Sequence, residues 1–487
     1  MRRYVKRTTL IALSIFLIGA TLTHAGGKRA GEAVVKVKTN AHVASIAEGL
    51  QLTVADSIPT HRTFLLKFPK NRSVDDVVNQ LNGNEFVELA SVNTTIDIPE
   101  VFQISQGFPD ESKPILNKGI SPHDFYGQAS SYNIGIDSAQ LFSTGKDVTV
   151  AVIDNGLDYS HPLIQSSNII SGHDFVTTGG DGSEQLGTIY GHGTFVTGLL
   201  LLTAPDVSIM PLRAFDGEGV GDQFKVAKSI DWAVKHGADI INMSFGTTDM
   251  IDALRSAIED ATNNNVVMIA ASGNEASTLP YYPAAHQDVI AVASVDTLER
   301  FADFSNYGEY IDLVAPGVNI YSTLAGNYDW GTWSGTSFSA PLVSGTVAMM
   351  TQIEKTYTPS DIQNHLRNTS RTELLWGTVV SPDIQYGYGM IDSYNAVSQL
   401  SIGDLDKSGT RDLTDLTMMV DYITSRNANG GGGSSATERA GYVVTDAMVD
   451  LNCDGDPHIS DIAILVHHIF VKWHDFKPCH QKGNNSK

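Results

Sequence analysis

Four polar residues occur in glycine-rich or small-residue contexts that suit nucleophilic catalysis. Ser337 lies in the small-residue stretch 335–341, Asp154 ends an apolar run, and His192 lies between two glycines. Asn274 follows a third glycine-containing segment. A serine at the start of a helix exposes its hydroxyl in the positive field of the helix N-terminus. Helix capping also favours serine there, but together with the aspartate and the histidine it predicts a Ser-His-Asp triad.

The segments around these residues alternate between two kinds of periodicity. Short runs rich in valine and isoleucine occur at 148–153, 208–212, 240–245, 266–270 and 289–295. Apolar residues at helical spacing lie between them, as at 224–234 and 251–258. This alternation predicts an α/β fold with a doubly wound, mostly parallel sheet. In such sheets ligands bind beyond the carboxyl ends of the strands, where Asp154 and Asn274 fall.

The N-terminus and the composition indicate a secreted protein. Residues 1–7 carry four basic side chains, an apolar stretch follows at 10–20, and Ala25 precedes a glycine. This pattern predicts a signal peptide at 1–25, and we expect no transmembrane span in the mature chain. The net charge of −22 argues against nucleic-acid binding. In an oxidising compartment the two cysteines, Cys453 and Cys479, could form one disulfide.

Residues 26–100 form a segment with a pattern of their own. Apolar periodicity predicts strand, helix, strand, strand, helix, strand, which is the order of a ferredoxin-like α+β unit. Ser73 and Asp76 have capping-box spacing at the start of the second helix. Residues 101–130 are polar and contain three prolines, so we expect an irregular linker or processing region there.

Two acidic loops lie in the C-terminal segment 401–480, each before an apolar helix pattern. Their oxygen-bearing residues alternate, with glycine at the sixth position, which is the spacing of a twelve-position calcium loop. The calcium ligands expected are Asp404, Asp406, Ser408, Thr410, Asp412 and Asp415 in the first loop, and Asp450, Asn452, Asp454, Asp456, His458 and Asp461 in the second.

The stretches around Asp154, His192 and Ser337 closely resemble the three signatures of the subtilisin-like serine proteases, and they occur in that family's chain order. The resemblance implies a subtilisin-like peptidase domain over about 131–400. Ser337 would be the nucleophile, His192 the general base and then acid, and Asp154 the residue that orients the imidazole. Asn274 would donate a hydrogen bond to the oxyanion.

The same resemblance implies the substrate-binding residues. One edge would pair with extended substrate and two segments would form the walls of the specificity pocket. These segments are Gly219, Val220 and Gly221 for the edge, Ser244, Phe245 and Gly246 for one wall, and Ala271, Ser272 and Gly273 for the other. Tyr281 would lie at the pocket floor, which predicts a preference for small side chains; packing on the surface instead is the alternative.

The flanking segments complete the resemblance. Residues 26–100 resemble an inhibitory propeptide, and 401–480 resemble a dockerin, a calcium-binding module that binds a cohesin partner in other proteins. We therefore expect a secreted serine endopeptidase acting on proteins or peptides, with its C-terminal module available for attachment to a partner or the cell surface. No cofactor is expected in the chemistry itself.

Three other functions are alternatives to this one. A lipase or esterase of the α/β-hydrolase type needs its aspartate and histidine after the serine, whereas here both precede it. A relative that works in acid through carboxylates would not need His192 and Asn274. A catalytically dead binding protein is the third alternative, and nothing in the sequence indicates loss of a catalytic position.

Overall fold

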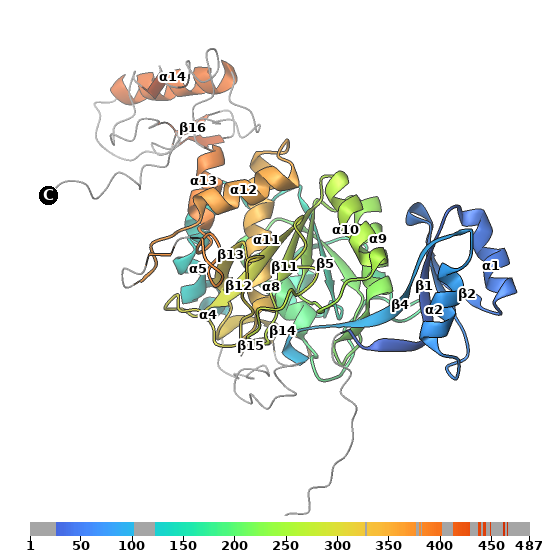
Figure 1. Ribbon diagram of the computed structural model, residues 1–487. Helices are drawn as coiled ribbons and strands as arrows, with labels where there is room; N and C mark the ends of the chain where they lie inside the picture. Colours follow the sequence, from blue (N-terminus) through green and yellow to red (C-terminus); the bar gives the residue numbers. More distant parts are fainter. Residues whose placement is uncertain are drawn as a thin grey trace, which may run out of the picture.

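The computed structural model describes residues 26–101, 122–326, 329–375, 379–380, 382–401 and 413–428, with short pieces at 437–439, 442–444, 449, 461–462 and 465. A small N-terminal unit lies beside a larger α/β body, and strand β4 reaches from the one to the other (Figure 1). The N-terminal unit has an apolar core of its own. Five side chains of residues 26–101 instead join the core of the body: Val34, Ile58, Leu65, Ile96 and Ile98.

The N-terminal unit has the predicted order of six elements. Its antiparallel sheet runs β2-β3-β1-β4, as in a ferredoxin-like fold. At the start of its second helix, Ser73 accepts a hydrogen bond from the backbone N–H of Asp76. The elements are β1 (Lys28–Val37), η1 (Asn40–His42), α1 (Val43–Gly49), β2 (Thr53–Ile58), η2 (Pro59–His61), β3 (Thr63–Lys67), α2 (Val74–Asn82) and β4 (Val87–Asp97).

The body is built on a parallel sheet, as the alternation of strands and helices predicted. Its strands follow the order β13-β12-β11-β10-β5-β8-β6, with β7 pairing to β8. Apart from the short strands β6 and β7, the strands are buried on both faces, which explains their largely apolar sequences. They are β5 (Thr149–Asp154), β6 (Asn168–Ile169), β7 (His173–Asp174), β8 (Ser208–Arg213), β10 (Ile240–Met243), β11 (Val267–Ala271), β12 (Val289–Val295) and β13 (Leu313–Pro316).

Two pairs of long helices connect and cover these strands. Helices α9 (Gln223–Lys235) and α10 (Asp252–Asn263) pack against each other, as do α8 (His192–Thr203) and α11 (Thr336–Ile353). The remaining elements of the body are β9 (Val220–Asp222), the hairpin β14 (Ile320–Leu324) and β15 (Asp329–Trp333), α6 (Ile136–Ala139), α7 (Pro162–Gln165), α12 (Pro359–Thr369) and α13 (Ser393–Ser401).

Helices α8 and α11 are buried around their whole circumference rather than along one stripe. All residues of α8 and most of α11 are buried. Their close approach depends on Gly345, because a Cβ there would lie 2.4 Å from Cβ of Thr203 in α8. A second small residue, Gly198 of α8, lies directly against Thr323 of β14.

Part of the segment expected to be an irregular linker is helical. Helices α4 (Pro122–Tyr126) and α5 (Ala129–Asn133) precede the body, and the ring of Phe125 packs at a tilt against Trp330 with ring centroids 4.8 Å apart. Gln128 donates a hydrogen bond to the carbonyl of Tyr321. The polar composition concealed these helices because tertiary contacts, not periodicity, hold such short segments.

In the C-terminal segment the structure describes helix α14 (Leu413–Ala428) and the hairpin of β16 (Thr437–Arg439) and β17 (Tyr442–Val444). Of the expected calcium ligands, Asp415 lies within α14 and Asp461 is buried; the other ten lie outside the described residues. The signal peptide, most of the linker, Cys453 and Cys479 also lie outside them. Among the helices that the structure describes, none is long and apolar enough to cross a membrane.

We predict that Gly345→Ala separates α8 from α11. Overpacking a close helix contact lowers the free energy of unfolding by about 1–3 kcal/mol. Because α8 begins at His192 and α11 at Thr336, the shift should also lower kcat/KM. Denaturant unfolding and peptide hydrolysis measure the two effects. Gly49→Ala is the control, since a Cβ at Gly49 meets nothing within 4 Å. Equal behaviour of the two variants would contradict the packing argument.

Candidate active site

The four residues singled out from the sequence meet at the carboxyl edge of the parallel sheet. Asp154 is the last residue of β5, and Asn274 lies in the loop after β11. His192 begins α8 and Ser337 lies in the first turn of α11. All four side chains are buried. The topology explains the convergence, because polar groups that follow parallel strands collect at the same edge of a sheet.

His192 lies between two carboxylates. Its Nδ1 lies 2.9 Å from Oδ1 of Asp154, and its Nε2 lies 3.2 Å from Oε2 of Glu100. The rings of Trp333 and Phe338 surround it, with centroids 5.6 and 5.5 Å away. Burial by itself lowers the pKa of His192, but the charges and hydrogen bonds of Asp154 and Glu100 outweigh burial and raise that pKa to about 10. The imidazole is therefore a protonated ring in this arrangement.

Ser337 is fixed by contacts on both its side chain and its backbone. Its Oγ donates a hydrogen bond of 2.8 Å to Oε2 of Glu100, and its carbonyl accepts one of 2.9 Å from Oγ of Ser244. A Cβ on Gly335, the residue that caps α11, would lie 1.8 Å from Oε1 of Glu100. Only glycine at position 335 leaves room for this carboxylate.

Asn274 is oriented by the start of α11. Its Oδ1 accepts hydrogen bonds from the N–H and the Oγ1 of Thr336, at 3.0 and 2.8 Å. This fixes the amide so that Nδ2 points into the centre, where it donates a 3.0 Å hydrogen bond to Oε1 of Glu100. A fixed amide donor next to a buried hydroxyl is the arrangement that stabilises negative charge on a reacting oxygen.

Glu100 contacts three of the four predicted residues, although nothing in its sequence context singled it out. It lies just after β4 and is fully buried. Its two oxygens stand where the oxygens of a reacting acyl group would stand, between a hydroxyl, an imidazole and an amide donor. The sequence pattern that could have identified Glu100 is an acidic residue shortly after strand β4. Many strands are followed by an acidic residue, so this pattern is not distinctive.

The strand β4 runs along the edge predicted to bind extended chains. Thr95, Ile96 and Asp97 pair antiparallel with β9. Asp97 also exchanges two backbone hydrogen bonds with Gly246, and the N–H of Ile98 donates to the carbonyl of Gly219. Backbone pairing on both sides is the way that an extended peptide is held regardless of its side chains.

The two predicted pocket walls enclose the ring of Tyr281. A Cβ on Gly246 would lie 2.2 Å from Cε1 of Tyr281, and one on Gly273 would lie 3.0 Å from its Cδ1. The tyrosine is 3% exposed, so its ring lies between the walls and not on the surface. Glu275 lies beside it, and burial raises the pKa of Glu275 to about 7 against the lowering effect of a hydrogen bond from Asn306. Glu275 was not predicted.

Two further side chains hold the helix that begins at His192. Glu184 accepts hydrogen bonds from the N–H of Gly191 and from the N–H and Oγ1 of Thr194, so it caps α8. Oδ1 of Asn155 accepts a 2.9 Å hydrogen bond from the N–H of Gly193. The sequence pointed to neither role, because the partners of Glu184 and Asn155 lie 7 to 38 residues away and outside any regular repeat.

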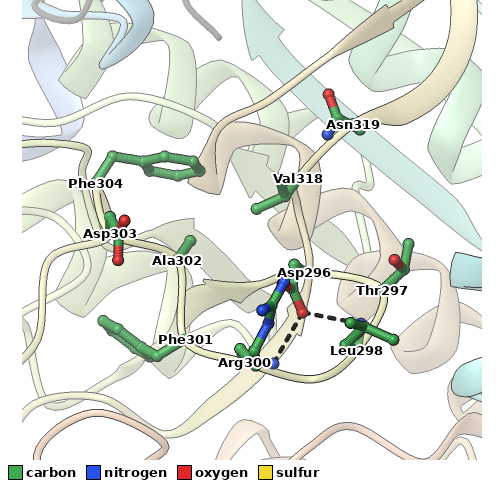
Figure 2. Close-up of a pocket in the computed structure, with 10 residues that line it drawn as sticks. All are labelled: Asp296, Thr297, Leu298, Arg300, Phe301, Ala302, Asp303, Phe304, Val318 and Asn319. Carbon is green, nitrogen blue, oxygen red and sulfur yellow. Dashed lines mark hydrogen bonds and ion pairs between the residues drawn. The ribbon is translucent and has the colours of Figure 1, made fainter.

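A separate cavity of about 450 Å³ opens between the loop 296–304 and residues Val318 and Asn319 (Figure 2). Figure 2 shows Arg300 turned back to Asp296, with which it forms an ion pair. The cavity adjoins the segment before α11, because the N–H of Asn319 donates to Oγ of Ser334. Its lining contains none of the four predicted catalytic side chains.

Comparison with known proteins shows the family of the chain. The profile of the subtilase family matches residues 145–389, about half of the chain, and the profile of the fervidolysin N-terminal prodomain matches residues 25–93. The thermophilic serine proteinase of Bacillus sp. (strain AK1) is 32% identical over 384 residues, which cover 76% of this chain and 87% of that protein. Subtilisin E of Bacillus subtilis (strain 168) is 30% identical, covering 68% of this chain and 90% of its own.

Among solved structures, the fold is similar to that of fervidolysin from Fervidobacterium pennivorans, a keratinolytic enzyme related to subtilisin. The TM-score is 0.63 at 24% identity, and the match covers 76% of this chain and 61% of that one. At this identity the likeness concerns the fold alone, and it includes the N-terminal unit because the match exceeds the length of the body.

We predict that Glu184→Gln reduces the pH dependence of stability. Burial raises the pKa of Glu184 from 4.5 to about 7, although three hydrogen bonds oppose the rise. A carboxyl group with a raised pKa keeps its proton in the folded state, so stability falls as pH rises from 4.5 to 7. The fall is on the order of 1–3 kcal/mol, since the side chain is partly exposed.

Urea unfolding at pH 4.5 and 7.5, in a Ser337→Ala background that prevents autolysis, measures this difference. The control is Glu218→Gln, whose carboxylate is exposed and accepts a hydrogen bond from Thr188. The control variant should show the same decrease in the free energy of unfolding between pH 4.5 and 7.5 as the unmodified background. If Glu184→Gln and the control show the same fall, Glu184 does not titrate as described.

Proposed function

Because this chain belongs to the subtilase family, we propose that Ser337, His192 and Asp154 carry its serine endopeptidase activity and that the chain is made as a secreted zymogen. The family assignment establishes a serine endopeptidase with an N-terminal prodomain. The observation that carries the residue assignment is the buried 2.9 Å contact of Asp154 with His192, together with the carboxylate oxygen that His192 and Ser337 share. The family assignment excludes a lipase or esterase of the α/β-hydrolase type.

In the proposed reaction, Oγ of Ser337 attacks the carbonyl carbon of the scissile peptide bond while Nε2 of His192 takes the hydroxyl proton. The resulting imidazolium is stabilised by Asp154 and then protonates the leaving amine. Water attacks the acyl-enzyme by the same route in reverse. The chemistry requires a neutral imidazole, so it belongs to a state of the site from which the carboxylate of Glu100 has left.

The oxyanion of each tetrahedral intermediate would accept hydrogen bonds from Nδ2 of Asn274 and the backbone N–H of Ser337. Support comes from the fixed orientation of the Asn274 amide, which already donates to a carboxylate oxygen. Loss of one such donor lowers kcat by about 10²–10³-fold. The complete set of catalytic positions also speaks against a dead binding protein.

We predict that Ser337→Ala abolishes proteolysis and leaves the prodomain attached. The expected loss is about 10⁶-fold in kcat, the magnitude known for removal of the triad serine from subtilisin. A casein zymogram with and without a fluorophosphonate, and the intact mass of the secreted protein, give the two readouts. Ser339→Ala is the matched control, since its hydroxyl bonds the carbonyl of Ala315. Residual turnover within tenfold of wild type would exclude Ser337 as the nucleophile.

The specificity pocket would favour small side chains before the scissile bond. This proposal rests on the ring of Tyr281, which lies between Gly246 and Gly273 and occupies the space that a large substrate side chain would need. Tyr310 contacts one of the two pocket walls, because its hydroxyl donates a hydrogen bond to the carbonyl of Ser272.

We predict that Tyr281→Gly shifts the preference from Ala toward Phe or Leu at that position. The shift should be about 10–200-fold in the ratio of kcat/KM values, since apolar size discrimination is worth about 1–3 kcal/mol. Matched Ala and Phe peptide substrates measure it, with Tyr282→Ala, at the neighbouring tyrosine, as the control. A wild-type enzyme that already prefers Phe would refute the filled pocket.

Secretion and attachment form the last part of the proposal. The N-terminal sequence supports export, and the two acidic loops support a calcium-binding C-terminal module that attaches to a cohesin-like partner or a surface. Within the part of the chain that the structure describes, no cluster of three or more acidic, histidine or cysteine side chains forms a metal site. The calcium proposal therefore rests on the loop spacing.

We predict that calcium protects residues 401–480 from added trypsin and that EGTA removes the protection. Clustered carboxylates repel one another without a cation, so the module should unfold when calcium is withdrawn. Asp404→Ala with Asp450→Ala should abolish the protection and leave peptide hydrolysis unchanged. Replacement of Ser434 and Ser435 by alanine, in the glycine-rich insert, is the control. Equal protection with and without calcium would show that the loops bind none.

A further inference from the structure

The chain leaves the substrate-like path just before it would cross the catalytic serine. Backbone pairing along β9 and Gly246 continues as far as Ile98. The next residue, Pro99, has no N–H and cannot extend the pairing. The N–H of Val101 instead donates to the carbonyl of Ile98, which closes a turn. The backbone pairing with this edge therefore ends at Ile98.

The turn places the side chain of Glu100 where the reacting group of a substrate would be. Its Oε2 accepts from Ser337 at 2.8 Å and lies 3.2 Å from Nε2 of His192, and its Oε1 accepts from Asn274 at 3.0 Å. Glu100 is 0% exposed. Charge-assisted hydrogen bonds of this kind are stronger than neutral ones, and together they satisfy both oxygens of the carboxylate.

We propose that Glu100 is the inhibitory residue of the precursor, a side-chain carboxylate that occupies the nucleophile, the general base and the oxyanion donor at once. This inference deepens the proposed function and rests on it. The carboxylate cannot be hydrolysed, because it carries no leaving amine. The group that Ser337 contacts in this segment is therefore one that it cannot cleave.

Binding of this carboxylate raises the pKa of His192 and so keeps the imidazole protonated. The carboxylates that contact the imidazole are Asp154 at the end of β5 and Glu100 after β4. Two further carboxyl groups lie near these, Glu184 near Asp154 and Glu275 near Glu100. The pKa of His192 is about 10 in this state, and the ordinary value is about 6.5. The contact is therefore fully stabilised below pH 6.5 and weakens as pH rises toward 10, approaching tenfold per unit.

The first test follows the reactivity of Ser337 in the full-length precursor. A fluorescent fluorophosphonate is added at pH 6.5, and the label in the precursor band is measured separately from the mature band. Glu100→Gln keeps the shape of the side chain but loses the charge, and Glu100→Ala removes it. Both should be labelled at least about tenfold faster than wild type, because hydrogen bonds to charged groups contribute more than a factor of ten to an equilibrium.

Glu85→Gln is the control, since Glu85 is an exposed acid of the same unit. It should be labelled at the wild-type rate. The ratio of the Glu100→Gln rate to the wild-type rate should shrink as pH rises from 6.5 toward 10; titration of Glu184 affects both proteins and cancels in the ratio. Equal labelling of Glu100→Gln and wild type would overturn the proposal. Absence of label in mature wild type would instead refute the proposed function.

The second test needs no catalysis. In the Ser337→Ala precursor, the downfield ring-proton resonance of His192, assigned by its loss in His192→Gln, is titrated by proton NMR. Adding Glu100→Gln should lower the pKa of His192 by at least one unit, because one of its two carboxylate neighbours has become neutral. A merely structural role of Glu100 would leave this pKa unchanged, and that result would overturn the proposal.

Discussion

The antiparallel pairing of β4 with β9 determines where the N-terminal unit meets the catalytic centre. It sets Thr95, Ile96 and Asp97 opposite Asp222, Gly221 and Val220. A slip of one residue would move the chain by about 3.3 Å and turn each side chain to the opposite face. Glu100 would then be unable to reach Ser337. The contacts in the centre therefore depend on a register that is fixed several residues earlier.

Buried polar groups at the start of α9 specify that register. Asn93 donates to Oδ1 of Asp222 and accepts from the N–H of Phe224, while Gln223 donates to Oγ1 of Thr94. These groups are buried, so a shifted register would leave them without partners at about 1–3 kcal/mol each. The ion pairs at the rim, such as Lys36 with Asp252, are partly exposed and contribute less. The amide network thus selects the register, and the apolar contacts of Val34, Ile58 and Leu65 stabilise it.

The sequence was sufficient for whatever depends on local pattern. Strand and helix periodicity predicted the six elements of the N-terminal unit and the parallel sheet, and glycine-rich signatures located Asp154, His192, Asn274 and Ser337. Glu100 could not be found in this way, because its hydrogen bond to Ser337 joins residues 237 positions apart. Glu184 and Glu275 were not predicted either, because their partners, 7–10 and 31 positions away, belong to no regular repeat. Their importance arises from burial, which a polar residue in a loop does not reveal in sequence.

Two buried carboxylates, Asp154 and Glu100, contact one imidazole, and the carboxyl groups of Glu184 and Glu275 lie behind them. A positive charge between the two carboxylates stabilises them, and the proton on His192 supplies it. A protonated imidazole cannot take a proton from Ser337. If Glu100 is the inhibitory residue, its departure both uncovers the hydroxyl and lowers the pKa of His192 toward the range of a working base. Departure of Glu100 would then both expose the hydroxyl of Ser337 and restore His192 as a base.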